Sequence, residues 1–305
     1  MESNILQLYN LTASNIEENE GVYTFESNFY QFFYVPFLRP EKDIDDLVDI
    51  SEEMAVKGLL THKIIKNSKG NYLTNFNDKL YILLLIVKDN STLDIYDIDQ
   101  YMRNLQLNTN KKNIFRVDWP SLWESKVDYY EYQMSKLGKD KKIILSTMSY
   151  YLGLAENAIA YASETVNTEK ISSNDRITIC HRRVYYPNYE LNYYNPLAYV
   201  IDLEVRDIAE YIKSYYFNNE DYNEIYQYLD NKILSVYSCR MLFARLLYPS
   251  YYFDQYDKIM NSDDDEEKII AIVEKATNYE SFLNNIFTLL NKKNPMPKVA
   301  WITKN

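Results

Sequence analysis

Cysteine, histidine and glycine are all rare in this chain of 305 residues, which contains two cysteines, two histidines and five glycines. The isolated Cys180 and Cys239 cannot form a disulfide framework, and such sparse cysteine is typical of a reducing compartment. A structural zinc site takes four ligands, usually from clustered cysteines and histidines, so the composition argues against one.

Two kinds of hydrophobic segment are also missing. The N-terminal stretch MESNILQLYNLTASNIEENE lacks the basic and apolar regions of a signal peptide. The apolar run Tyr81–Val87 is too short to span a bilayer. We therefore expect synthesis in the cytoplasm and no membrane span.

Positive charge is in deficit, because 33 lysines and arginines face 44 aspartates and glutamates, giving a formal charge of -11. Contact with nucleic acid phosphates requires clustered lysine and arginine, so we expect no nucleic-acid partner. The acidic run Asp263–Glu267 lacks the spaced ligands and the glycine of a calcium loop. We interpret it as the solvated start of a helix that Ser262 caps.

Tyrosine is abundant, with 32 residues, in an otherwise ordinary globular composition of 47% hydrophobic and 25% charged residues. An AT-rich genome would produce this bias without selection. Alternatively, tyrosine-rich surfaces serve packing into an assembly, since the side chain combines an apolar ring with a polar tip.

The first 90 residues read as a β-rich lobe. Residues 22–37 form two aromatic strand segments around a Glu-Ser-Asn break, which predicts a hairpin. Residues 43–57 show helical spacing of apolar side chains, with Gly58 as a stop. Three strand-like runs between residues 60 and 87 are separated by turn residues and predict an antiparallel meander.

From residue 91 to residue 305 the pattern is mostly helical, so two lobes meet near residues 88–92. Helices are expected at 93–105, 120–137 and 141–165, and again from about 204 to 290. A small β element, at 176–180 and 198–202, interrupts them. Trp119 and Trp123 are interpreted as the hydrophobic start of the second helix, with Pro120 at its first position.

The stretch ICHRRVYYPN, residues 179–188, forms the loop of this β element, and the following strand, AYVID, ends in Asp202. Kinases place their chemistry in such a loop. There an aspartate accepts the proton of the nucleophile, while an asparagine and a second aspartate hold magnesium ions.

Four segments carry a family resemblance: residues 147–162, 179–183, 200–216 and 296–302. They resemble the aminoglycoside phosphotransferase-like superfamily and, within it, the spore coat-associated YutH group, a relative of the CotS-like coat proteins. With the order of the N-terminal elements, the resemblance covers nearly the whole chain. It implies an α+β, two-lobed protein kinase-like fold, with a small β-rich N-lobe (1–90) and a larger, mostly helical C-lobe (91–305).

The superfamily's loop, H-G-D-L-H-P-G-N, aligns without gaps from His181 to Asn188. The catalytic aspartate then falls on Arg183, and the metal-binding aspartate falls on Asp202. The aspartate of a later D-L-A motif falls on Asp207. Both types of magnesium ligand are thus present, but an arginine, which stays protonated, replaces the base.

The N-lobe lacks two further parts of a phosphotransfer site. Kinases use a glycine-rich loop over the phosphates and a lysine on the third strand. Gly21 is the only glycine before residue 58, and the first lysine of the chain is Lys42. The third strand, FYQFFYVPF, therefore contains no lysine, and no glycine-rich loop precedes it.

The candidate site residues have structural interpretations beside the functional ones. His181 is either a base or metal ligand or a ring that packs behind the loop and hydrogen-bonds a backbone group, and we favour the second interpretation. Asn188 either forms an Asx-turn or binds metal. Asp202 needs a partner, which is Arg183, Arg206 or Mg²⁺. If Arg183 is that partner, its loss should cost about 3–5 kcal/mol of stability.

Arg206 and Asp207, at the start of the next helix, are expected to support the loop. No catalytic residue is expected. Asn188 and Asp202 would bind a cofactor only if the chain were active.

These observations predict a pseudokinase that acts as an interaction or assembly protein. The resemblance implies synthesis in the mother-cell cytoplasm, deposition in the spore coat, other coat or sporulation proteins as partners, and no cofactor. The alternative is a metal-dependent small-molecule kinase or nucleotide-binding pseudokinase that holds Mg-ATP through Asn188 and Asp202. A third possibility is a cleft that binds a ligand other than a nucleotide.

Overall fold

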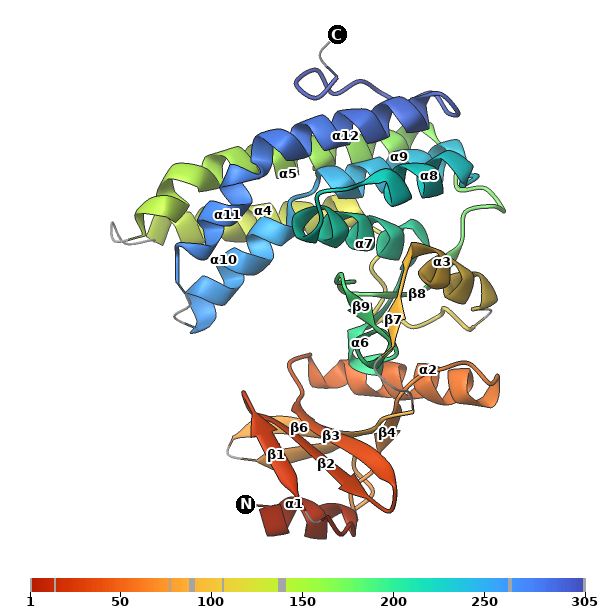
Figure 1. Cartoon of the computed structure of the whole chain (residues 1–305), viewed down its shortest axis with the longest axis vertical. Coiled ribbons are helices and arrows are strands. Elements are labelled where there is room, and N and C mark those ends of the chain that lie inside the picture. The colour runs from red at the N-terminus through yellow and green to blue at the C-terminus, as the bar shows by residue number, and fades with distance from the viewer. Residues whose placement is uncertain are drawn as a thin grey trace. The chain divides into compact units, whose positions relative to one another are not determined.

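The computed structural model describes residues 2–13, 15–76, 78–87, 91–105, 107–136, 141–262 and 265–303 (Figure 1). The chain divides into two compact units. The first comprises Met1–Leu93, Arg103–Phe115 and Asn188–Ile201, and the second comprises Asp94–Met102, Arg116–Pro187 and Asp202–Asn305. Residues 88–90, part of the predicted meeting point of the lobes, lie outside the described residues.

The first unit contains an antiparallel sheet and one long helix. Its main elements are α1 (Glu2–Tyr9), β1 (Ile16–Asn19), β2 (Val22–Ser27), β3 (Tyr30–Pro36), α2 (Ile44–Val56), β4 (Lys63–Ile65), β5 (Leu73–Phe76) and β6 (Lys79–Leu85). The predicted hairpin and helix are confirmed, and Gly58, with a φ of +71°, follows the helix end as expected. The sequence analysis did not predict α1 or β1.

The strand order is β1-β2-β3-β6-β4, and β5 also pairs with β6. The predicted meander is wrong in one respect, because β4 pairs with β6 and not with β5. Both β4 and β5 are antiparallel to β6. The loop between them is held by Asn67, whose Oδ1 accepts the N–H groups of Lys69 and Asn71 at 3.0 Å. As a result, β4 pairs with residues 83–85 of β6, and β5 pairs with residues 79–82.

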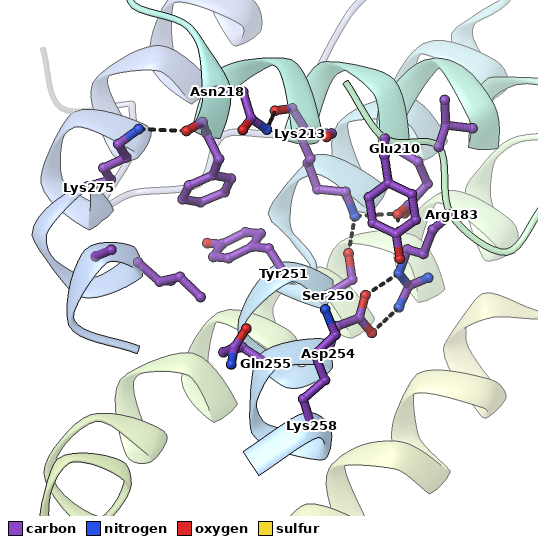
Figure 2. A pocket seen from close by; sticks show the side chains of 16 residues that line it. Arg183, Glu210, Lys213, Asn218, Ser250, Tyr251, Asp254, Gln255, Lys258 and Lys275 are labelled. Carbon is purple, nitrogen blue, oxygen red and sulfur yellow. Dashed lines mark hydrogen bonds and ion pairs between the residues drawn. The ribbon is translucent and has the colours of Figure 1, made fainter. Parts of the chain in front are cut away.

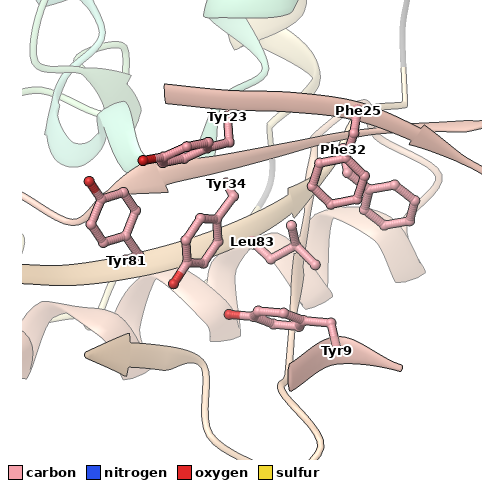
Figure 3. Packing of buried hydrophobic residues seen from close by; sticks show 7 residues of the cluster. All are labelled: Tyr9, Tyr23, Phe25, Phe32, Tyr34, Tyr81 and Leu83. Atoms are coloured by element: carbon pink, nitrogen blue, oxygen red, sulfur yellow. The ribbon is translucent and has the colours of Figure 1, made fainter. Parts of the chain in front are cut away.

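Alternating aromatic side chains make the core of this sheet (Figure 3). Tyr23, on β2, and Tyr34, on β3, point inward with Tyr81 from β6, and the rings of Tyr34 and Tyr81 stack with centroids 4.8 Å apart. Phe25 and Phe32 stack at 5.5 Å. The period-two pattern of a half-buried strand therefore defines this core.

A later segment of the chain belongs to the first unit because buried polar groups bind it there. The first unit also contains β7 (Thr92–Leu93), β9 (Asn188–Tyr189) and α6 (Glu190–Tyr193). The Arg39 guanidinium pairs with Asp43 at 3.0 Å and donates to the carbonyls of Leu197 and Tyr199. His62 Nε2 lies 2.7 Å from the Leu191 carbonyl.

The second unit is helical. Its elements are α3 (Ile95–Asn104), α4 (Trp119–Lys136), α5 (Lys142–Thr168), β8 (Ile177–His181), α7 (Val205–Asn218), α8 (Asn223–Asn231), α9 (Val236–Leu247), α10 (Ser250–Ser262), α11 (Lys268–Glu274) and α12 (Ala276–Asn291), with the end of β10 (Tyr199–Leu203). The predicted helices and both predicted short strands are confirmed. Residue 137, the last of one predicted helix, lies outside the described residues.

One predicted helix start is wrong. Ser262 is the last residue of α10, and the next helix, α11, begins at Lys268. Residues 263 and 264 of the acidic run lie outside the described residues. The apolar residues of α10, such as Tyr256 and Ile259, are buried and continue the helix to the point where the acidic run begins.

Helix α9 lies at the centre of this unit, where it packs against α5, α7 and α12 (Figure 1). Most of its side chains are buried, which is typical of a helix surrounded by others. The C-terminal segment packs on the unit through the buried side chains of Met296, Val299 and Ile302, while Trp301 is partly exposed. Among the described residues, none of the helices has the length and hydrophobicity needed to cross a bilayer.

Candidate functional site

Strand β8 positions His181 at the start of the loop that the sequence singles out. The His181 N–H donates to Asp207 Oδ1 at 2.7 Å, and its ring Nδ1 lies 2.5 Å from Asp207 Oδ2. Both side chains are buried. Asp207 lies in the first turn of α7, where the helix dipole favours a carboxylate, so it fixes the end of β8 from behind.

Asp202, near the end of β10, is completely buried. Its Oδ1 accepts hydrogen bonds from Trp119 Nε1 and from the Leu203 N–H, both at 2.8 Å. Its Oδ2 accepts from Trp119 Nε1 at 3.0 Å and pairs with Arg206 Nη1 at 2.5 Å. Burial raises the pKa of Asp202, while Arg206 and Arg245 oppose the rise.

Of the partners considered for Asp202, the structure places Arg206 beside it. Arg206 also donates through Nε to the His181 carbonyl at 2.7 Å and through Nη2 to the Arg182 carbonyl at 3.2 Å. One guanidinium thus links the strand end, the loop and α7. Arg206 and Asp207 both have the contacts that loop support requires.

Arg183, which the resemblance aligns with the catalytic aspartate, pairs with a different carboxylate. Its Nε and Nη2 donate to the two oxygens of Asp254 on α10, with Nη2 at 2.7 Å, and its Nε lies 3.6 Å from Glu210 Oε2. Burial alone would lower the pKa of Arg183, but Asp254 and Glu210 raise it well above its ordinary value. The hypothesised pair between Arg183 and Asp202 is therefore wrong.

Glu210, on α7, is the centre of a buried ionic network. Its Oε1 lies 2.8 Å from Lys213 Nζ and 3.0 Å from Arg245 Nε. Lys213 also donates to Ser250 Oγ at 2.6 Å. The Arg245 guanidinium lies over the Trp119 ring, 4.7 Å from its centroid. The network therefore extends from the ring that donates to Asp202 as far as α10.

The charges in this network change one another's proton affinities. Burial alone would raise the pKa of Glu210, but Lys213, Arg183 and Arg245 lower it far below 4.5. Burial lowers the pKa of Lys213 to about 8, against the attraction of Glu210. Burial also lowers the pKa of Arg245 to about 10. Glu210 is thus a carboxylate near neutral pH, and it compensates the buried cations.

The sequence analysis missed Trp119, Glu210, Lys213, Arg245 and Asp254 as parts of this site. A signal was present for two of them, because Arg206, Glu210 and Lys213 follow one another at spacings of four and three, which places them on one face of a helix. The prediction for that helix rested on its apolar face, and its charged face was not considered. Trp119, Arg245 and Asp254 lie far away in sequence and carry no such signal.

Asn188 belongs to the first unit, whereas Asp202 belongs to the second. Asn188 lies in β9, where it pairs with Leu93 of β7, and not in the turn that one interpretation proposed. Its side chain is buried, and within the described part of the chain its Nδ2 has no hydrogen-bond partner.

Magnesium does not fit Asp202 as the structure holds it. Both carboxylate oxygens already accept hydrogen bonds, so a metal ion would have to displace Arg206 or Trp119. Among the described residues, no group of three or more histidine, cysteine, aspartate or glutamate side chains is placed to hold a metal ion. No magnesium-dependent step follows from this geometry.

Comparisons with known proteins agree with the resemblance seen in the sequence. A family model described as "Spore coat putative kinase YutH" matches residues 2–286. The endospore coat-associated protein YutH of Bacillus subtilis (strain 168) is 32% identical over 209 residues. That alignment spans 61% of this chain and 61% of the length of the relative.

Solved structures of phosphotransferases share the fold. An aminoglycoside phosphotransferase from Alicyclobacillus acidocaldarius matches with a TM-score of 0.60 at 12% identity, covering 94% of this chain and 95% of its own. Choline kinase LicA from Streptococcus pneumoniae matches with a TM-score of 0.55 at 11% identity, covering 94% and 97%. These likenesses confirm the predicted kinase-like fold, with a small antiparallel sheet in one lobe and helices in the other.

Proposed function

Since the chain belongs to the spore coat putative kinase YutH family, we propose that it is a catalytically degenerate kinase-like protein that acts in the spore coat. Its role there is interaction or assembly. Family membership and the kinase-like fold support the association with the coat. The name of the Bacillus subtilis relative, an endospore coat-associated protein, supports the same location.

One observation carries the proposed loss of catalysis. Arg183 stands where the superfamily's loop has its catalytic aspartate, and two carboxylates hold its guanidinium in the charged form. Phosphotransfer to a hydroxyl requires a side chain that accepts or orients the proton of the nucleophile. A guanidinium bound by Asp254 and Glu210 can do neither.

Two further features argue against binding of the ATP phosphates. The carboxylate oxygens of Asp202 already accept hydrogen bonds from Arg206, from Trp119 and from the Leu203 N–H. Strand β3, the third in the sheet, reads YQFFYVP and has no lysine. Each of these two features by itself weakens binding of Mg-ATP.

Exposed tyrosines favour the assembly role. Tyr30, Tyr132 and Tyr185 have exposed fractions of 58%, 62% and 57%. Tyrosine supplies a large contact area with a polar tip and is enriched in protein interfaces. We therefore propose other coat or sporulation proteins as partners, with synthesis in the mother-cell cytoplasm before deposition.

Catalytic loss is tested by assaying the purified full-length chain for ATP turnover with and without Mg²⁺. We expect ADP formation no faster than in a protein-free control, and the same rate for the Asp202→Asn variant. Turnover that requires both Mg²⁺ and Asp202 would overturn the proposal.

The location is tested by producing a tagged chain in sporulating Bacillus subtilis that lacks its own YutH protein. We expect the tag in the extractable coat fraction of purified spores. A tag that is released entirely with the mother-cell cytoplasm would contradict the coat assignment, whatever the result of the ATP assay.

A second candidate, nucleotide binding without catalysis, is favoured by Asn188. Its buried Nδ2 is a donor without a partner in the part of the chain that the structure describes, and a phosphate oxygen would satisfy it. Calorimetric titration with ATP, with and without Mg²⁺, decides this. Binding that is lost in Asn188→Ala supports the second candidate, and no heat at millimolar ATP excludes it.

A further inference from the structure

A pocket of about 300 Å³ lies within the second unit, beside the ionic network (Figure 2). Its walls come from the loop after β8 and from helices α7, α10 and α11, with Lys275 just beyond α11. This volume is at the lower end of the range of small-molecule sites, about 300–1,000 Å³. Its size suits a compact metabolite.

The pocket wall has the opposite charge to the chain as a whole. Four of its side chains are cationic and two are carboxylates, which gives a formal charge of +2 in a chain of -11; they are Arg183, Lys213, Lys258 and Lys275 against Glu210 and Asp254. Both carboxylates already pair with cations of the protein. The wall therefore favours an anion over a cation.

Lys275 is the cation best placed to meet such an anion. It is half-buried, and its Nζ donates to the carbonyl of Phe217 at 2.7 Å, a neutral acceptor. An ammonium group has three donors, so further donors remain for a ligand. Because the site is partly withdrawn from water, a carboxylate placed there would interact more strongly than it would at an open surface.

The remaining wall is aromatic and apolar. The rings of Phe217 and Tyr251 lie with centroids 4.4 Å apart and an angle of 46° between their planes. Figure 2 shows the Tyr251 ring below Lys213 and facing the interior of the pocket. Val184 and Ile272 also line it. A ligand that fills this space needs an apolar body beside its charged group.

We propose that this pocket binds a small organic carboxylate with a flat apolar or aromatic body. The carboxylate lies at Lys275, and the body packs against Phe217 and Tyr251. The proposed ligand contacts neither Asn188 nor Asp202, the two residues of the alternative nucleotide site.

Three probes of similar shape and different charge test the proposal on the full-length chain: benzoate, benzamide and benzylamine. Binding is measured by ligand-observed NMR and calorimetry. We expect benzoate to bind about tenfold more tightly than benzamide, since a hydrogen bond to a charged group is worth more than a neutral one. Benzylamine should bind more weakly still. No benzoate binding at about 10 mM, or equal binding of benzoate and benzylamine, overturns the proposal.

Variants then locate the site. Lys275→Gln should weaken benzoate about tenfold and leave benzamide unchanged, while Lys275→Arg should retain most of the affinity. Ala271→Trp, at an exposed position of the wall, should fill the pocket and abolish binding of both probes although Lys275 itself is retained. Lys292→Gln removes an exposed lysine outside the pocket and is the charge-matched control.

The folding of each variant is checked by its melting temperature, so that a destabilised Lys275 variant is not mistaken for a binding defect. If Lys275→Gln fails to fold, Ala271→Trp still decides the question. Benzoate binding that survives Ala271→Trp places the anion elsewhere on the chain and refutes the proposed site.

Discussion

The sheet of the first unit and the loop region of the second bury different kinds of side chain. In the sheet, stacked rings such as Tyr34 and Tyr81 fill the core. Around the loop, Asp202, Glu210 and their cationic partners are buried together. Aromatic packing is nearly indifferent to pH, whereas a buried ionic network depends on every partner retaining its charge.

The contrast also bears on function. In an active kinase the charged groups of the loop face the metal ion and the phosphates. In this protein they face one another, because Arg206 and Arg183 use the carboxylates. The carboxylates around this loop are thus engaged in internal contacts, which supports the proposed loss of catalysis.

Glu210→Gln should have the largest effect of the substitutions considered. It leaves Lys213, Arg245 and Arg183 without their shared carboxylate, so we expect a loss of about 5 kcal/mol in the free energy of unfolding. Urea denaturation at pH 6 measures it. Glu220→Gln, at an exposed glutamate, is the control and should change stability by less than about 0.5 kcal/mol.

The same pair of proteins gives a pH test. The folded-state pKa of Glu210 lies below its ordinary 4.5, so below pH 4.5 the unfolded chain binds a proton that the folded chain does not. The contribution of Glu210 is therefore complete above that pH and is lost as the pH falls towards the folded-state value. The difference between wild type and Glu210→Gln should shrink on acidification; a difference that grows would contradict the network.

Tyr34→Ala should cost slightly less, about 4 kcal/mol, because it removes a fully buried ring from the sheet core. Tyr30→Ala, on the same strand but 58% exposed, is the matched control. Unlike the effect of Glu210→Gln, this loss should stay constant between pH 4 and pH 6 in urea denaturation. If the stability loss of Tyr34→Ala depended strongly on pH, the proposed difference between the sheet core and the ionic network would be contradicted.

Asp202 and Arg206 should be coupled by about 2 kcal/mol in a double-mutant cycle. The cycle uses Asp202→Asn, Arg206→Met and the double variant, each measured by urea denaturation. Each single change leaves a buried partner uncompensated, so the double variant should lose less stability than the sum of the two. Strict additivity would mean that the pair contributes no mutual stabilisation.

Arg183→Ala should have the smallest effect, about 1 kcal/mol, because the side chains of Arg183 and Asp254 are 27% and 35% exposed and water replaces part of the pair. This is below the cost predicted from sequence for a buried partner of Asp202. Arg182→Ala, at the exposed neighbouring arginine, serves as the control. A loss as large as that of Glu210→Gln would show that Arg183 holds the network together.

Most elements of the fold were predictable because their signals are local. The hairpin at residues 22–37, the helix ended by Gly58 and the long helices follow from the spacing of apolar residues and from turn residues. The pairing of β5 with β6 follows from the predicted meander, but the pairing of β4 with β6 was not predictable, since it depends on which strand edge is free after folding. Likewise, Ser262 resembles a cap in sequence, but α10 continues to it, after turns in which Tyr256 and Ile259 are buried.

By itself, the sequence determined that an arginine occupies position 183, that residues 29–37 contain no lysine and that an aspartate closes the apolar run at residues 198–202. Only the tertiary structure decided which cation meets which carboxylate. Arg183 and Arg206 were equal candidates for Asp202 in sequence, but Arg206, in the first turn of α7, lies beside Asp202, while Arg183 pairs with Asp254 on α10. Ion pairs form only between groups that folding brings within a few ångströms, and the sequence does not show that Arg183 reaches Asp254, 71 residues further along the chain.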